Sequence, residues 1–141
     1  MTSNTPVEQE ILSGGECWER LRSAIVGRIV YLDERTGVEV FPVNYVVDSG
    51  TIVLRTAAGT KLSALTGRPP VAFESDGGDL ADGTAWAVVL HGTAEPMVAH
   101  DEIVDAFDLD LSTWHGAPKP FFVRVVPTDI VGRGVGIGKR P

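Results

Sequence analysis

The spacing of hydrophobic residues predicts one helix near the start of the chain. After Ser13 the apolar positions recur every three or four residues, at Cys17, Trp18, Leu21, Ala24 and Ile25. This repeat is typical of a helix with one buried face. Ser13 or Gly14 is expected to begin the helix, with Glu16 in its first turn. Gly27 is expected to end it.

The pattern then changes to short runs that indicate strands. Residues 28–32, 38–47 and 51–56 are rich in apolar and β-branched side chains. The connections at 33–37 and 48–50 are polar and contain glycine. Connections this short predict an antiparallel meander, because parallel strands need long crossovers.

The second half of the chain continues the same alternation of short elements. Two helices and four more strands are predicted there, at residues 61–66 and 100–107 and at 71–74, 86–94, 121–126 and 130–135. Residues 76–83 are predicted to be an acidic, glycine-rich loop, and Gly92 inside a strand indicates a bulge or a close backbone approach. The sum is a mainly β (α+β) fold, and this strand spacing favours an antiparallel barrel or sandwich.

Length and charge narrow the class of protein. A chain of 141 residues is expected to form a single domain over residues 1–141, with residues 1–10 as a flexible arm. The net charge of −7 disfavours nucleic acid as a partner, because the phosphate backbone is repelled. The polar amino end and the absence of a long apolar run predict a cytoplasmic protein without a membrane partner.

The cysteine and the histidines do not form a recognisable metal site. Cys17 is the one cysteine, which rules out an intrachain disulfide and a cysteine-based zinc site, so it is expected to be a small buried hydrophobe. His91, His100 and His115 lie in three different contexts, and only His91 is a candidate to face a pocket. Trp114 and His115 are expected in a lid over the barrel or in ordinary packing. No metal is predicted.

The stretch Leu54–Leu62 carries the clearest candidate chemistry. A predicted strand ends in Arg55 and Thr56, small residues follow, and Thr60 and Lys61 lie at the start of a predicted helix. Backbone N–H groups, a guanidinium, an ammonium and a hydroxyl together suit a phosphate. The alternative is an ordinary strand-to-helix turn with two solvated cations, and spacing alone leaves both open.

A second stretch, Val40–Val46, has a proline inside a predicted strand. Pro42 removes one N–H donor, so this strand is expected to lie at a sheet edge or to bend there. Asn44 and Tyr45 next to such a bend are candidates to face a planar ligand. The alternative, which the pattern alone favours, is a core strand with a bulge.

Together these stretches resemble the pyridoxamine 5′-phosphate oxidase-related, FMN-binding split-barrel family, and within it the nitroimidazole-resistance-like branch. The order and spacing of the matching segments hold from Glu16 to Arg133. The segments are Glu16–Trp18, Gly27–Ile29, Pro42–Tyr45, Arg55–Leu62, Val71–Asp76, Trp86–Val89, His91–Ala94, Arg124–Pro127 and Gly132–Arg133.

The resemblance implies a fold, a cofactor and a set of site residues. It implies a homodimer of six-stranded antiparallel split β-barrels with short flanking helices and with FMN at the subunit interface. Three residues are implied to hold the FMN phosphate: Arg55, Thr60 and Lys61. Four are implied to lie along the isoalloxazine ring: Pro42, Val43, Asn44 and Tyr45. Thr56 is implied near the ring or the ribityl chain, and Trp86 of the other subunit completes the pocket.

The chain also departs from the family pattern. Ala85-Trp86-Ala87 stands where this branch usually has Gly-Trp-Ser, and His91 stands where an arginine is common. Gly132-Arg133-Gly134 stands where two arginines are often adjacent. The carboxy-terminal extension with the substrate-binding arginine and tryptophan of true pyridoxamine phosphate oxidases is missing, which disfavours vitamin B6 oxidation.

Three functions are compatible with this pattern. The first is an FMN-dependent oxidoreductase that reduces an unidentified small acceptor, with no catalytic side chain assigned. The second is a protein that binds or senses a flavin, or the deazaflavin F420, without turnover. The third is a degenerate barrel that binds no cofactor, which the alanines at 85 and 87 motivate.

Overall fold

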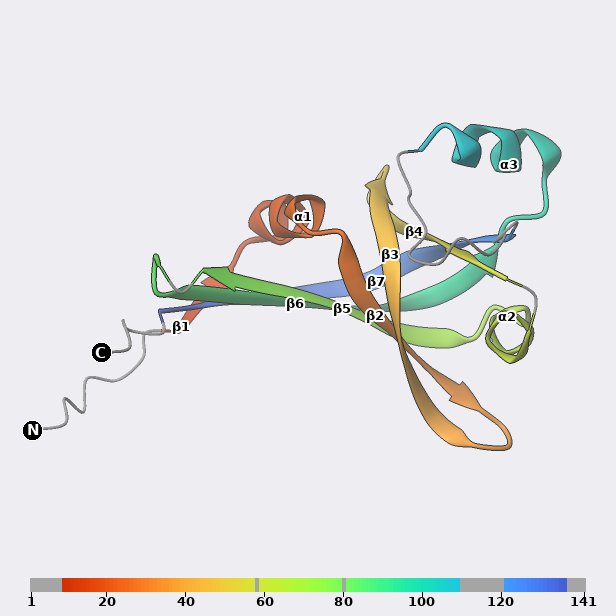
Figure 1. Ribbon diagram of the computed structural model, residues 1–141, viewed down its shortest axis with the longest axis horizontal. Helices are drawn as coiled ribbons and strands as arrows, with labels where there is room; N and C mark the ends of the chain where they lie inside the picture. The colour runs from red at the N-terminus through yellow and green to blue at the C-terminus, as the bar shows by residue number, and fades with distance from the viewer. Residues whose placement is uncertain (1–8, 58, 80, 110–120, 137–141) are drawn as a thin grey trace, which may run out of the picture.

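The computed structural model of the chain describes residues 9–57, 59–79, 81–109 and 121–136, which form seven strands and three helices (Figure 1). In chain order these are β1 (Gln9–Leu12), α1 (Gly14–Ser23), β2 (Val26–Asp33), β3 (Gly37–Asp48), β4 (Thr51–Thr56), α2 (Thr60–Leu65), β5 (Pro70–Asp79), β6 (Thr84–Pro96), α3 (His100–Phe107) and β7 (Phe121–Gly136).

All seven strands belong to one antiparallel sheet that closes on itself. The strand order is β1-β7-β4-β3-β2-β5-β6, and β6 pairs back onto β7. Strands β2 to β7 therefore form a ring of six, which confirms the predicted split barrel. β1 adds a seventh strand outside the ring, with Gln9 opposite Val135 and Glu10 opposite Gly134. Gln9 and Glu10, which were expected in a flexible arm, thus belong to the sheet.

The predicted meander of three strands is confirmed by the register of β2, β3 and β4. The turn between β3 and β4 has Ser49 and Gly50 at positive φ, 50° and 71°, as tight hairpin turns require. The turn between β2 and β3 is held by Asp33, whose carboxylate accepts hydrogen bonds from the backbone N–H groups of Arg35 and Thr36. These hydrogen bonds lower the pKa of Asp33.

Helix α1 begins where the sequence predicts and ends earlier. Ser13 Oγ accepts from the N–H of Glu16, and the Glu16 carboxylate accepts from the N–H of Ser13, which is a complete capping box. The helix ends at Ser23, so the prediction that Gly27 ends it is wrong. Gly27 lies inside β2, where a Cβ atom would be 2.3 Å from the ring of Phe73. This glycine serves close packing and does not break a helix.

The later strands are longer than their patterns suggest. The predicted loop at 76–83 is β5 as far as Asp79, paired with the start of β6. The two segments at 121–126 and 130–135 are one strand, β7, which pairs with β6 along most of its length. The predicted irregularity at Gly92 is confirmed as a register shift between His91 and Gly92. A Cβ atom on Gly92 would lie 2.1 Å from the carbonyl oxygen of Val126.

The buried side chains form two clusters. The larger one fills the barrel and includes Leu21 of α1, Phe73 of β5 and Leu65 of α2. The smaller one lies under α3 and comprises Val53, Met97, Ala106 and Phe122. Figure 1 shows α1 and α3 over different parts of the sheet, with α2 beside its right-hand end. None of the three described helices has the length and apolar character needed to span a lipid bilayer.

Candidate cofactor site

The four residues implied along a flavin ring split between the two faces of β3. Val43 and Tyr45 face the barrel interior and are 7% and 3% exposed. The hydroxyl of Tyr45 lies 2.6 Å from the carbonyl oxygen of Leu21 and 3.1 Å from Ser75 Oγ, and its ring packs edge-on against Phe73. Strand alternation puts Pro42 and Asn44 on the outer face. The side chains of Val43 and Tyr45 therefore point away from a ligand on that face, and the backbone N–H of Tyr45 donates to the carbonyl oxygen of Ile25.

The first half of β3 is a sheet edge in the described part of the chain. Residues Gly37–Asn44 pair with β2, and pairing with β4 begins only at Tyr45. Pro42, opposite Arg28, lies in this half. The prediction that Pro42 marks an edge is confirmed. Val38 and Val40 share the outer face and are 69% and 54% exposed.

Arg55 and Thr56 end β4 and point in opposite directions. Thr56 is 2% exposed, and its hydroxyl donates to the carbonyl oxygen of Ala57. Arg55 lies on the outer face, directly opposite Phe122 of β7. Its guanidinium carbon is 5.0 Å from the centre of the Phe122 ring and 5.4 Å from that of Phe107 on α3. Arg55 thus rests against α3, a neighbour that the sequence did not indicate.

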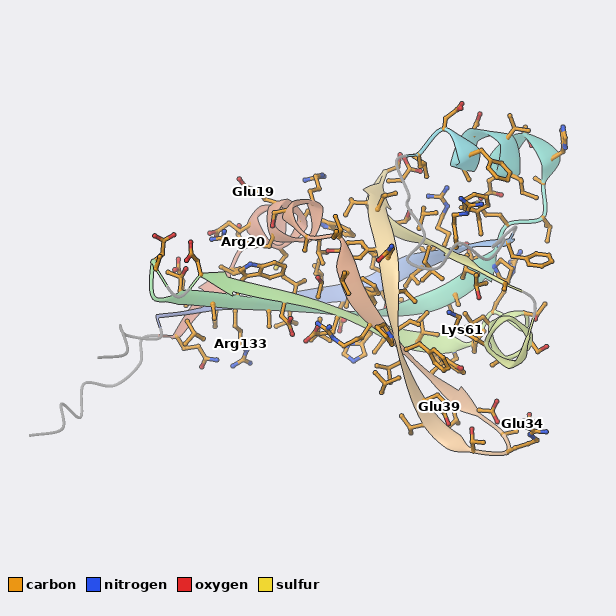
Figure 2. All side chains as sticks on the ribbon, in the orientation of Figure 1. Glu19, Arg20, Glu34, Glu39, Lys61 and Arg133 are labelled. Carbon is orange, nitrogen blue, oxygen red and sulfur yellow. The ribbon has the colours of Figure 1, made fainter. Side chains whose placement is uncertain are left out.

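The turn into α2 depends on a glycine. Gly59 precedes the helix with φ 154° and ψ −167°, a backbone conformation that other residues rarely adopt. The backbone of Thr60 begins α2, one residue before the predicted start. The ammonium of Lys61 lies 5.2 Å from the centre of the Phe41 ring, and Figure 2 places Lys61 between α2 and the strands β2 and β3.

Eight of the nine predicted site residues come from adjoining segments. Leu54 is the last residue of β4 that pairs with β3, so Arg55 and Thr56 extend β4 beyond the point where the two strands separate. Lys61 and Arg55 nevertheless rest on different aromatic rings. The ninth residue is Trp86, near the start of β6.

Trp86 lies in the part of β6 that is at the opposite end of the sheet from α2, which carries Lys61. Its indole covers Gly77 of β5, where a Cβ atom would be 2.8 Å from the indole nitrogen. It lines a cavity of about 550 Å³ together with Glu16 and Arg20 of α1. This cavity includes the start of β6, which lies at the left of Figure 1, whereas α2 lies at the right.

The structure describes Cys17 and His91, but not every histidine that the sequence analysis considered. Cys17 is buried, and burial raises the pKa of its thiol, as expected of a small hydrophobe. His91 lines a groove of about 410 Å³, with its Nδ1 3.0 Å from Asp129 Oδ1. Trp114 and His115 lie outside the described residues. Within the described ranges, no three of the His, Cys, Asp and Glu side chains gather as a metal site would require.

One carboxyl group on the outer face has a perturbed pKa. Burial raises the pKa of Glu74, a hydrogen bond with Asp76 raises it further, and Arg28 opposes both effects. Arg28 bridges the two acids, with Nη2 2.9 Å from Asp76 Oδ1. This cluster joins β2 to β5.

The sequence profile and the solved structures that match this chain point to the same family. The sequence profile described as pyridoxamine 5′-phosphate oxidase matches residues 13–134. The crystal structure of a candidate pyridoxamine 5′-phosphate oxidase from Corynebacterium glutamicum is 41% identical, with a TM-score of 0.81 over 90% of this chain and 98% of that one. An FAD-binding protein from Mycobacterium smegmatis is 38% identical, with a TM-score of 0.74 over 88% and 96%. A candidate 5-nitroimidazole antibiotic resistance protein from Bacteroides thetaiotaomicron, 14% identical over 94% and 91% with a TM-score of 0.72, shares the fold alone.

Proposed function

This chain belongs to the pyridoxamine 5′-phosphate oxidase family, and on that premise we propose that it is a flavoprotein that binds FMN and passes electrons to a small acceptor. The observation that carries the proposal is the segment from Arg55 to Lys61. It places two cations on either side of a glycine turn in a chain whose net charge is −7. A phosphate needs such a local cluster, because the overall charge repels it.

The residues present fit a flavin phosphate by the chemistry of their donors. Arg55 supplies a planar fork of N–H groups and Lys61 a compact positive charge, and phosphate accepts both. The open edge of β3 offers backbone N–H and C=O groups to the polar edge of the ring system, except at Pro42, which has no N–H. Val43 and Tyr45 hold that strand in place through the core.

When bound, FMN supplies the hydride or electron transfer. The protein binds and orients it, and the pattern of side chains assigns no acid or base. Tyr45 is the one proton donor among the four residues on β3, and its hydroxyl is committed to Leu21 and Ser75 inside the barrel. We propose a nicotinamide as the electron donor and a small nitro compound or quinone as the electron acceptor.

A homodimer is part of the proposal. Within one chain, the start of β6 with Trp86 and helix α2 with Lys61 lie at opposite ends of the sheet, so a pocket with all nine residues needs a second copy. The exposed side chains Leu32, Val38 and Val40 on the β2–β3 hairpin support contact with another chain, because apolar surface favours association. A monomer at micromolar concentration by light scattering would contradict this part of the proposal.

FAD is a second candidate cofactor. The solved relative from M. smegmatis, 38% identical to this chain, is described as FAD-binding. FAD and FMN share the ring system and a phosphate on the ribityl chain, so the same two cations suit both. The deazaflavin F420 remains a third candidate, and binding without turnover an alternative to oxidoreduction.

The first experiment is the absorption spectrum of the purified, dialysed protein, with mass spectrometry of the cofactor released by acid. FMN at about one per chain is the expected result, and FAD or F420 would correct the identity of the cofactor. A colourless protein that stays colourless after incubation with FMN, FAD and F420 would overturn the proposal. Oxidation of a nicotinamide with a panel of nitro and quinone acceptors then separates turnover from binding alone.

A double variant tests the phosphate ligands. Arg55→Ala combined with Lys61→Ala is expected to abolish flavin retention during dialysis. The matched control is Arg22→Ala with Arg35→Ala, which removes the same charge from two exposed positions on α1 and the β2–β3 turn. Equal retention in both double variants would contradict the assignment of Arg55 and Lys61.

A further inference from the structure

The aromatic residues around Arg55 form a defined support for its guanidinium. Phe122 is fixed opposite Arg55 by the register of β4 and β7. Phe107, the last residue of α3, adds a second ring, and the two rings meet edge to face with centres 5.0 Å apart and planes at 83°. The guanidinium carbon lies within cation–π distance of both centres, at 5.0 and 5.4 Å.

We propose that Phe107 is a positioning residue that holds Arg55 in place for the phosphate of the cofactor. This inference rests on the proposed function. The faces of the two rings contact the positive guanidinium, whereas a phosphate would accept hydrogen bonds from its N–H groups. Contact with two rings therefore restricts the positions that the Arg55 guanidinium can take. Arg55 also loses less rotational freedom on binding, because it is already ordered.

Packing of α3 explains how Phe107 keeps its position. Ala106 is buried against Val53, Met97 and Phe122 on the outer face of the barrel. Glu102 lies 3.6 Å from Arg124 of β7, and Arg124 also contacts Asp48 and Thr51 at the turn between β3 and β4. The helix is thus tied to β7, the strand that pairs with β4 at Arg55.

Burial alone does not account for a phenylalanine at this position. Phe107 is 56% exposed, so much of the ring remains in water, whereas Phe122 below it is 2% exposed. The exposed ring lies against a cation that the proposed site uses. Val104, an apolar residue of the same helix three positions before Phe107, is also half exposed, which makes it a suitable control position.

The test compares FMN with riboflavin, which has the same ring system and no phosphate. Phe107→Leu keeps an apolar side chain against Phe122 and removes the aromatic face. We expect its affinity for FMN to fall about tenfold, within the range of a partly desolvated cation–π contact. Its affinity for riboflavin should not change. Phe107→Trp should restore the preference for FMN, and Val104→Ala should leave it as in the native protein.

A measurement without flavin tests the contact between Phe107 and Arg55 separately from cofactor binding. Ring currents should shift the side-chain proton resonances of Arg55 upfield in the native protein, and Phe107→Leu should reduce that shift. An unchanged FMN-to-riboflavin ratio in Phe107→Leu, in a protein that binds FMN, would overturn this inference and leave the proposed function intact. Native protein that binds neither flavin would overturn the proposed function and this inference with it.

Discussion

A Cβ atom built on Gly132 of β7 would lie 2.5 Å from the Sγ atom of Cys17, so α1 packs directly onto the backbone of β7. Leu12 and Val88 approach the same point at 3.1 and 3.2 Å. The glycine is needed because a buried side chain occupies the space where its own would be. The one cysteine of the chain therefore has a packing role, which its buried and protonated thiol fits.

Gly132→Ala should lower the free energy of unfolding by about 1–3 kcal/mol, as overpacking of a filled core does. Gly134→Ala is the matched control in the same strand, because its Cβ would meet Leu12 at an ordinary 3.5 Å. Cys17→Ala combined with Gly132→Ala should recover part of the loss, since the sulfur is then absent. Chemical denaturation of the native protein, of the single variants Cys17→Ala and Gly132→Ala and of the double variant gives the coupling. Strict additivity would contradict the contact.

The bulge at Gly92 predicts a larger effect. A Cβ atom there would meet only backbone, at 2.1 Å from the oxygen of Val126 and 2.9 Å from Pro127 Cα, and backbone cannot rotate away. Gly92→Ala should cost about 3 kcal/mol, at the upper end for overpacking. Gly136→Ala, with nothing within 4 Å of its Cβ position, should change little. Thermal unfolding of the pair checks this, and equal midpoints would argue against the bulge geometry.

Tyr45→Phe tests the hydrogen bond that anchors β3 to α1. Loss of the hydroxyl leaves the carbonyl oxygen of Leu21 without that donor, at a cost of about 1–2 kcal/mol. Burial raises the pKa of Tyr45, so the native state keeps this proton at a pH where the unfolded chain loses it. The stability from this group is present below the ordinary tyrosine pKa and is lost as the pH rises through the native one.

The measurement for Tyr45→Phe is the unfolding midpoint against pH from neutral to alkaline. The variant should be less stable near neutrality and should lose stability less steeply above pH ~10. Tyr31, whose pKa burial also raises, accounts for an alkaline slope that remains in the variant. Identical slopes in both proteins would show that Tyr45 does not contribute.

Glu74 and Asp76, the acid pair on β5, predict a titration that changes when one of the two acids is removed. Asp76→Asn removes a group that raises the pKa of Glu74, so that pKa should fall. Because the raised pKa makes the protonated native state favourable, the corresponding stability is present at acidic pH and lost as the pH rises through the native pKa. The variant should therefore show a shallower dependence of stability on pH.

Carbon-13 NMR of the Glu74 carboxyl group measures the pKa shift directly. Asp82→Asn, at an exposed position beyond the strand, is the control and should leave the Glu74 titration unchanged. A Glu74 pKa that does not move in Asp76→Asn would contradict the contact between the two acids.

Local rules explain which parts of the fold could be predicted from the sequence. The start of α1 depends on Ser13 and Glu16, and the β3–β4 turn depends on Ser49 and Gly50, all within a few residues of one another. Gly27, by contrast, accommodates the ring of Phe73, which comes from a distant strand. A glycine that permits close packing and one that ends a helix look the same in a sequence.

In the candidate site, too, local features could be predicted from the sequence and contacts between distant segments could not. The segment from Arg55 to Lys61 is contiguous, so its cations, its glycine and its place between a strand and a helix could be recognised. The support of Arg55 by Phe107 could not, because it depends on where α3 packs. The side chains of Val43 and Tyr45 point inward because of the strand register, and a slip of one residue would turn them outward.

The open edge of β3 has a consequence for how the chain behaves among its own copies. In the described part of the chain, the backbone groups of β3 beside exposed Val38 and Val40 pair with no strand on the side away from β2. Such an edge is a template to which strands of other molecules can add, and such addition leads to aggregates. Pro42 interrupts this edge, since it has no N–H to offer. Pro42, which marks the candidate ligand edge, thus also limits the addition of strands from other molecules. Its replacement would give a longer continuous edge and a protein that aggregates more readily.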